Sequence, residues 1–262
     1  MTAALNRDGF ALYGFDAKIA AWAQSAMHLA EDALQDEELL KTWMMCEGTW
    51  FVGVDALATG PNGEAGETAL AGAVIDDLVE GLPAKLPMHK AQLSVVYPGY
   101  PKPRSGESEA AFRYRLKRDA AHVDGLHAIG PDRRRHLSEH HVYLLGLPLT
   151  DCGPDAAPLV VWRGSHRLVQ EWLVSKLAHI PTNEWGKVDL TDDYIALRKQ
   201  IFETCLRVEI YRRPGEAVLM HRHVLHGIAP WRDNAPSIST GRQIAYFRPE
   251  IACDLTHWLR DD

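Results

Sequence analysis

VYLLGLPLTDCGPDAAPLVVWRGSH, residues 142–166, decides the fold class. Two runs of mostly apolar residues that overlap this stretch, 140–149 and 157–162, are typical of buried strands, and the Asp, Gly and Pro residues between them are typical of a turn. Similar runs occur elsewhere, so the chain from residue 90 onward is predicted to be mainly β. These runs are AQLSVVY (91–97), LRVEIYR (206–212), EAVLMH (216–221) and RQIAYF (242–247).

The N-terminal third has a helical pattern instead. Apolar residues at three-to-four spacing, from Ile19 to Ala30, predict helices between residues 16 and 45, and a further helix is expected over 68–80. Another helix, DDYIALRKQIFETCLRV (192–208), is predicted to interrupt the strands.

Short strands that are braced by helices predict a double-stranded β-helix, a jelly-roll or cupin-like barrel with a helical N-terminal region. The length of 262 residues is compatible with one domain. We expect residues 1–89 to support the barrel and help to shape a pocket, and residues 90–250 to form the jelly-roll core.

The composition of the chain limits the classes of partner that it is expected to bind. The net charge of -7 disfavours nucleic acid, and the basic run Arg133-Arg134-Arg135 favours a solvated loop, with an anionic substrate as the alternative. The N-terminus lacks a signal-peptide pattern and no apolar run is as long as a membrane span. The four cysteines are scattered and suggest neither a zinc knuckle nor a disulfide framework. We therefore expect a cytoplasmic protein with a small-molecule partner and no membrane; the sequence predicts no oligomeric state.

A metal site is the main chemical hypothesis. On a strand, His122 and Asp124 of HVD would point to the same side, although this short pattern is weak evidence by itself. GEAVLMHRHVLHG offers His221, His223 and His226 as a third ligand. Two histidines and a carboxylate on one face of an octahedron form the triad of non-haem Fe(II) oxygenases. The alternative is a set of surface or core histidines.

Four stretches, taken in order, resemble the phytanoyl-CoA dioxygenase family of Fe(II)/2-oxoglutarate-dependent oxygenases. HVD (122–124) resembles the His-x-Asp of the family, and the segment 142–166 resembles its strand, turn and Pro-Gly-Ser-His ending, here RGSH. GEAVLMHRHVLHG (215–227) resembles the strand that precedes His-Gly, and GRQIAYF (241–247) resembles the strand with the co-substrate arginine.

The resemblance implies roles for individual residues. His226, which Gly227 follows, would be the distal ligand beside His122 and Asp124, with His221 as its main rival. Arg242 would bind the distal carboxylate of 2-oxoglutarate; because the spacing from His226 is long for the family, Arg232 is the alternative. The cofactors implied are Fe(II), 2-oxoglutarate as co-substrate and O2.

The reaction implied is hydroxylation of a small molecule with release of succinate and CO2. In related halogenases a small residue replaces the carboxylate, so Asp124 favours hydroxylation, or another oxidation by the same iron species, over chlorination. Two alternatives stay open: a cupin-type metal enzyme that does not use 2-oxoglutarate, and a non-catalytic jelly roll that binds a ligand.

Overall fold

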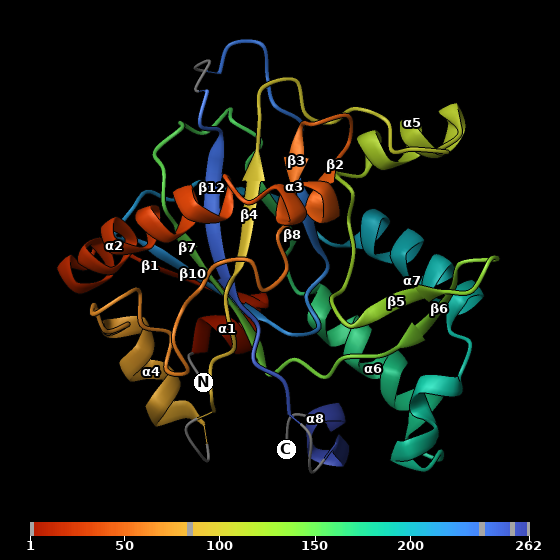
Figure 1. Cartoon of the computed structure of the whole chain (residues 1–262). Helices are drawn as coiled ribbons and strands as arrows, with labels where there is room; N and C mark the ends of the chain where they lie inside the picture. The colour runs from red at the N-terminus through yellow and green to blue at the C-terminus, as the bar shows by residue number, and fades with distance from the viewer. Residues whose placement is uncertain (1–2, 83–85, 236–238, 252–254, 261–262) are drawn as a thin grey trace.

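Two antiparallel sheets form the centre of the computed structural model, which describes residues 3–82, 86–235, 239–251 and 255–260 (Figure 1). This arrangement confirms the predicted fold class, a mainly β jelly roll with flanking helices. The larger sheet has the strand order β1 (Phe10–Tyr13), β10 (Ala217–His221), β7 (Tyr143–Pro148), β12 (Arg242–Phe247), β4 (Gln92–Val96), β3 (Trp50–Phe51) and β2 (Met44–Met45). The smaller sheet has the order β11 (His226–Ile228), β8 (Leu159–Trp162) and β9 (Arg207–Ile210), and β5 (Leu126–Ile129) pairs with β6 (Arg134–Leu137).

The space between the two sheets is apolar. Side chains alternate along a strand, so every second residue of the larger sheet points toward the smaller one. Leu144 of β7 and Val218 of β10 pack there with Leu159 and Val161 of β8. The same alternation along β12 turns Tyr246 inward, where it packs against this cluster. The barrel interior is therefore built from both sheets and is available for a site.

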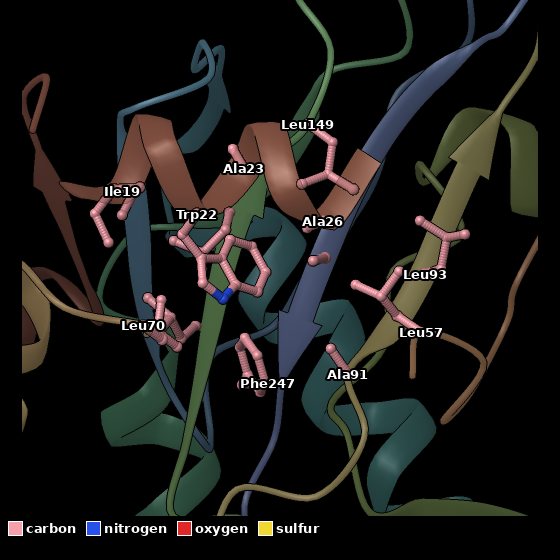
Figure 2. Packing of buried hydrophobic residues seen from close by; sticks show 14 of the residues in the cluster. Ile19, Trp22, Ala23, Ala26, Leu57, Leu70, Ala91, Leu93, Leu149 and Phe247 are labelled. Atoms are coloured by element: carbon pink, nitrogen blue, oxygen red, sulfur yellow. The ribbon is translucent and has the colours of Figure 1, made fainter. Parts of the chain in front are cut away.

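Helix α2 (Ala17–Ala33) covers the outer face of the larger sheet (Figure 2). The small side chains of Ala23 and Ala26 let the helix lie close to the strands, and the Trp22 ring lies 5.7 Å from that of Phe247. The Trp22 indole donates a hydrogen bond to the Gly63 carbonyl at 2.7 Å. The helix layer thus covers the outer face of β12, while the inner face of this strand lines the barrel interior.

Helices α6 (Ser165–Leu177) and α7 (Thr191–Thr204) cover the smaller sheet. Val160 and Trp162 of β8 pack against them. The helices predicted for 16–45, 68–80 and 192–208 correspond to α2 with α3 (Glu37–Trp43), to α4 (Ala73–Gly81) and to α7. The other helices of the described residues are α1 (Ala3–Asp8), α5 (Glu109–Lys117), a 3₁₀ helix (Thr182–Lys187) and α8 (Leu255–Arg260).

The first third of the chain contributes strands as well as helices. β1 lies at one edge of the larger sheet, where Phe10 pairs with Met220, and β3 pairs with β4. Cys46, Cys152 and Cys205 are free thiols, while Cys253 lies outside the described residues. None of the helices in the described ranges is long and apolar enough to cross a bilayer.

Candidate metal centre

His122 lies opposite His226 at the end of the smaller sheet. The His122 amide donates to the His226 carbonyl at 2.8 Å, and the His226 amide donates back at 3.0 Å. The predicted strand around His122 and Asp124 is only this single bridge, because left-handed residues bend the chain at Ala120 (φ 52°) and Gly125 (φ 82°). The bridge nevertheless brings the two segments to the mouth of the barrel.

The three predicted ligands converge. His122 Nε2 lies 3.2 Å from Asp124 Oδ1, and His226 Nε2 lies 3.7 Å from the same oxygen. The ligand atoms of all three residues lie within 4.8 Å of one another. The His122 side chain is 43% exposed, whereas those of Asp124 and His226 are 9% exposed. One side of the group is therefore open.

Main-chain carbonyls orient both imidazoles. Nδ1 of His122 lies 3.1 Å from the Ala120 carbonyl oxygen, and Nδ1 of His226 lies 3.0 Å from that of Val224. A carbonyl oxygen can only accept, so each Nδ1 carries the proton and a neutral ring keeps its lone pair on Nε2. Two such lone pairs beside a carboxylate repel one another unless a cation lies between them. The donor set therefore fits a divalent transition metal.

The charges of the group suit a metal. Burial lowers the pKa of His226 to about 4, so this imidazole is neutral at pH 7. Burial alone would raise the pKa of Asp124, but its polar surroundings, which include the Arg248 guanidinium, hold it well below its usual range. Asp124 is thus ionised. The centre offers two nitrogen ligands and one negative oxygen ligand.

Gly227 permits the two ligand segments to approach. A Cβ on Gly227 would lie 2.2 Å from the Asp119 carbonyl oxygen, and the neighbouring Ile228 amide donates to that oxygen at 2.8 Å. Gly125, just after Asp124, is equally restricted, since its φ is 82° and a Cβ would lie 2.4 Å from a backbone oxygen. Both glycines after ligand positions are required by the backbone.

The rival histidines lie elsewhere. The His223 amide donates to Nδ1 of His221 at 3.1 Å, and the ring of His223 packs edge-on to Trp258 with centroids 4.8 Å apart. Within the described residues, His122, Asp124 and His226 are the group that gathers three possible ligands, and neither rival belongs to it.

The two candidate arginines differ in their surroundings. Arg232 is bound on the surface by Asp155 at 2.7 Å and Glu209 at 2.5 Å. Arg242 is buried on the inward face of β12, its Nε has no hydrogen-bond partner, and it has no ion pair with any described residue. Arg242 nevertheless does not line the cavity at the triad; it lines a smaller neighbouring one.

Tyr246 and Arg248 are site residues that we did not predict. Burial raises the pKa of Tyr246, and the nearby Arg242 guanidinium partly offsets that rise, while Arg248 Nη1 lies 3.4 Å from Asp124 Oδ2. Tyr246 fits because its partner in β7 is Gly146, where a Cβ would lie 2.8 Å from the tyrosine ring. Alternation along β12 puts Tyr246 on one face with Arg242, and Arg248 follows the end of the strand at the same two-residue spacing. That spacing was visible in the sequence.

Two cavities meet at the triad. One, of about 160 Å³, is lined by the triad together with inward residues that include Gln92, Leu144 and Tyr246. The second, of about 550 Å³, also has His122 and Asp124 in its wall. Trp50 and Arg248 line both cavities. The group could therefore hold a metal that is reached from two compartments.

Comparisons with known proteins identify the fold. No protein-family model matches the sequence, and no curated protein matches it. Among solved structures, AviO1 from Streptomyces viridochromogenes Tue57 is 16% identical, with 96% of this chain and 94% of that chain covered and a TM-score of 0.51. At this identity the likeness shows a shared fold over nearly the whole chain.

Two other solved structures are similar at TM-scores below 0.5. SnoN, a non-heme alpha ketoglutarate dependent epimerase from nogalamycin biosynthesis, is 16% identical, with 94% of this chain and 79% of that chain covered and a TM-score of 0.49. EctD from S. alaskensis, in a structure with 2-oxoglutarate and 5-hydroxyectoine, is 18% identical, with 94% and 75% covered and a TM-score of 0.46.

Proposed function

We propose that this protein is an Fe(II)- and 2-oxoglutarate-dependent oxygenase that hydroxylates a small molecule. The observation that carries the proposal is the convergence of two Nε2 lone pairs and the Asp124 carboxylate at the mouth of a jelly roll, with both Nδ1 protons held by carbonyls. This donor set is the one that non-haem Fe(II) oxygenases use. Iron and 2-oxoglutarate in the crystallised SnoN complex, and 2-oxoglutarate in EctD, are compatible with this assignment.

His122, Asp124 and His226 would hold the iron from one side and leave its other face open. With 2-oxoglutarate and O2, bound iron supplies oxidative decarboxylation to succinate and CO2, and one oxygen atom enters a C–H bond of the substrate. Arg242 would bind the far carboxylate of 2-oxoglutarate, because a buried guanidinium without an acidic partner suits a bidentate anion. Leu144 and Leu159 in the cavity wall would limit the access of water.

Asp124 bears on the reaction type. An intact carboxylate ligand leaves no ligand position for chloride, which favours hydroxylation over chlorination. We place the protein nearest to the phytanoyl-CoA dioxygenase type on the four ordered stretches that end in GRQIAYF (241–247). A compartment that keeps the three described thiols reduced, such as the cytoplasm, suits the protein.

Anaerobic titration of Fe(II) and 2-oxoglutarate into the apo protein tests the proposal. We expect the visible charge-transfer band of chelated 2-oxoglutarate in the wild type and in His221→Ala, and no band in His226→Ala. His221 is the matched control because it comes from the same stretch and stands outside the triad. Absence of the band from the wild type would refute the proposal and leave the cupin-type or non-catalytic alternative.

The role of Arg242 has its own test. We expect Arg242→Gln to raise the Kd for 2-oxoglutarate by about 100-fold, since a charge-assisted bidentate contact contributes about 3 kcal/mol. Arg232→Gln should leave that Kd unchanged. If Arg248→Gln abolishes 2-oxoglutarate binding while Arg242→Gln does not, the co-substrate lies against Arg248 and our assignment is wrong.

A further inference from the structure

Apart from one carboxylate, the charged side chains that line the larger cavity beside the triad are arginines. Its volume of about 550 Å³ is in the range of small-molecule sites. Asp124 is the only carboxylate in its lining. Besides Arg248, the arginines in its wall are Arg104, Arg115, Arg118, Arg133, Arg135 and Arg198. In a protein with a net charge of -7, this concentration of cations is local.

Two of these arginines have acidic partners. Arg115 is bound by Glu107 at 2.7 Å, and Arg248 lies 3.4 Å from Asp124. None of the other five forms an ion pair with a described residue, and two of them, Arg104 and Arg133, are exposed while the remaining three are partly buried. A partly buried cation without a counter-charge is unfavourable unless something else compensates it.

Neutral groups hold the partly buried arginines in place. Arg198 donates to the Tyr114 hydroxyl at 3.2 Å and lies 5.9 Å from the centre of the Phe202 ring. The Arg118 guanidinium also lies over the Phe202 ring, 4.5 Å from its centroid. Arg135 Nη1 donates to the Leu126 carbonyl at 2.9 Å. Aromatic faces and carbonyls position these guanidiniums without neutralising them.

The cations also act on one another. Burial lowers the pKa of Arg135, and the positive charges of Arg198, Arg133 and Arg104 lower it further. The middle residue of the basic run behaves differently, because Arg134 binds Asp189 at 2.6 Å and Asp192 at 3.3 Å. In the basic run, Arg134 is therefore bound at the surface, whereas Arg133 and Arg135 line the cavity.

We propose that this cavity binds a small-molecule substrate through a phosphate or diphosphate ester, with the substrate carbon that is oxidised lying beside His122 and Asp124. The oxidation rests on the proposed function, whereas the binding does not. Guanidinium groups bind phosphate oxygens in bidentate pairs, and five cations without partners exceed what one carboxylate could neutralise. The overall negative charge opposes binding of a nucleic-acid polymer.

Calorimetric titration of inorganic pyrophosphate into the metal-free protein, at low and moderate salt, tests the proposal. We expect saturable binding, weakened at least about tenfold in Arg135→Gln and in Arg118→Gln, since each removes a charged hydrogen-bond donor. Arg134→Gln is the matched control and should keep the wild-type affinity. Circular dichroism and thermal melting show that each variant is folded.

Three results would overturn the proposal: no binding of pyrophosphate, equal weakening in Arg134→Gln, or tighter binding of citrate or of a single-stranded oligonucleotide. A fourth result, displacement of pyrophosphate from the metal-free protein by 2-oxoglutarate, would also overturn it, because the arginines would then serve the co-substrate. A charge-transfer band without pyrophosphate binding refutes only the substrate class. Pyrophosphate binding without a band refutes only the oxygenase.

Discussion

Gly227→Ala tests how closely the two ligand segments must approach. The added Cβ would lie 2.2 Å from the Asp119 carbonyl oxygen and 3.1 Å from its carbonyl carbon. A carbon and an oxygen that are not bonded need roughly 3.3 Å, so the segments have to separate by about 1 Å. Both contacts are with main-chain atoms, and no side-chain rotation can relieve them.

This separation falls on the main-chain hydrogen bonds between His122 and His226, which are 2.8 and 3.0 Å long. Interactions that orient metal ligands typically change metal affinity by about 10- to 100-fold. We expect the same loss of Fe(II) affinity in Gly227→Ala, together with a decrease of about 1–3 kcal/mol in the free energy of unfolding from overpacking.

Anaerobic equilibrium dialysis with Fe(II) measures the affinity, and urea denaturation of the metal-free protein measures the stability. Gly14→Ala is the matched control, because an added Cβ there meets no heavy atom within 4 Å. If Gly227→Ala binds Fe(II) as tightly as Gly14→Ala, the close approach does not set the ligand geometry and the reasoning fails.

Two further substitutions are expected to change the free energy of unfolding without removing a metal ligand. Arg115 hydrogen bonds hold the pKa of Glu107 at about 2, below its usual 4.5, so their stabilisation is complete above about pH 4.5 and disappears as the pH falls through 2. In urea denaturation across this range, Glu107→Gln should lose about 1 kcal/mol at pH 7 and match the wild type at the acid end; a constant difference would contradict this. Trp22→Phe leaves the Gly63 carbonyl without its 2.7 Å donor and should cost about 1–3 kcal/mol in thermal unfolding without changing Fe(II) affinity.

The strands and the ligand group could be predicted because their signals are local. An apolar run such as the one in β7 reports burial directly, and the pair His226-Gly227 has a backbone reason, namely the 2.2 Å approach to Asp119. The strand geometry considered for His122 and Asp124 is reduced to a single bridge, and nothing in HVD indicates that left-handed residues bend the chain on both sides.

The arginine-lined cavity could not be predicted in the same way. Arg104, Arg118 and Arg198 come from separate segments that only the tertiary fold brings into one wall. Net charge averages over the surface, so a value of -7 conceals a local excess of cations. In the sequence, the basic run at 133–135 was the one sign of this excess. Its division between surface and cavity depends on Asp189 and Asp192, which bind Arg134 from a segment far along the chain.

The carbonyl that holds each imidazole belongs to the residue two positions earlier in the same chain segment, Ala120 for His122 and Val224 for His226. The course of the backbone thus supplies one acceptor for each ring. Side chains in the walls of either compartment that do not contact the rings can therefore be exchanged, and with them the choice of substrate, without removing these two acceptors.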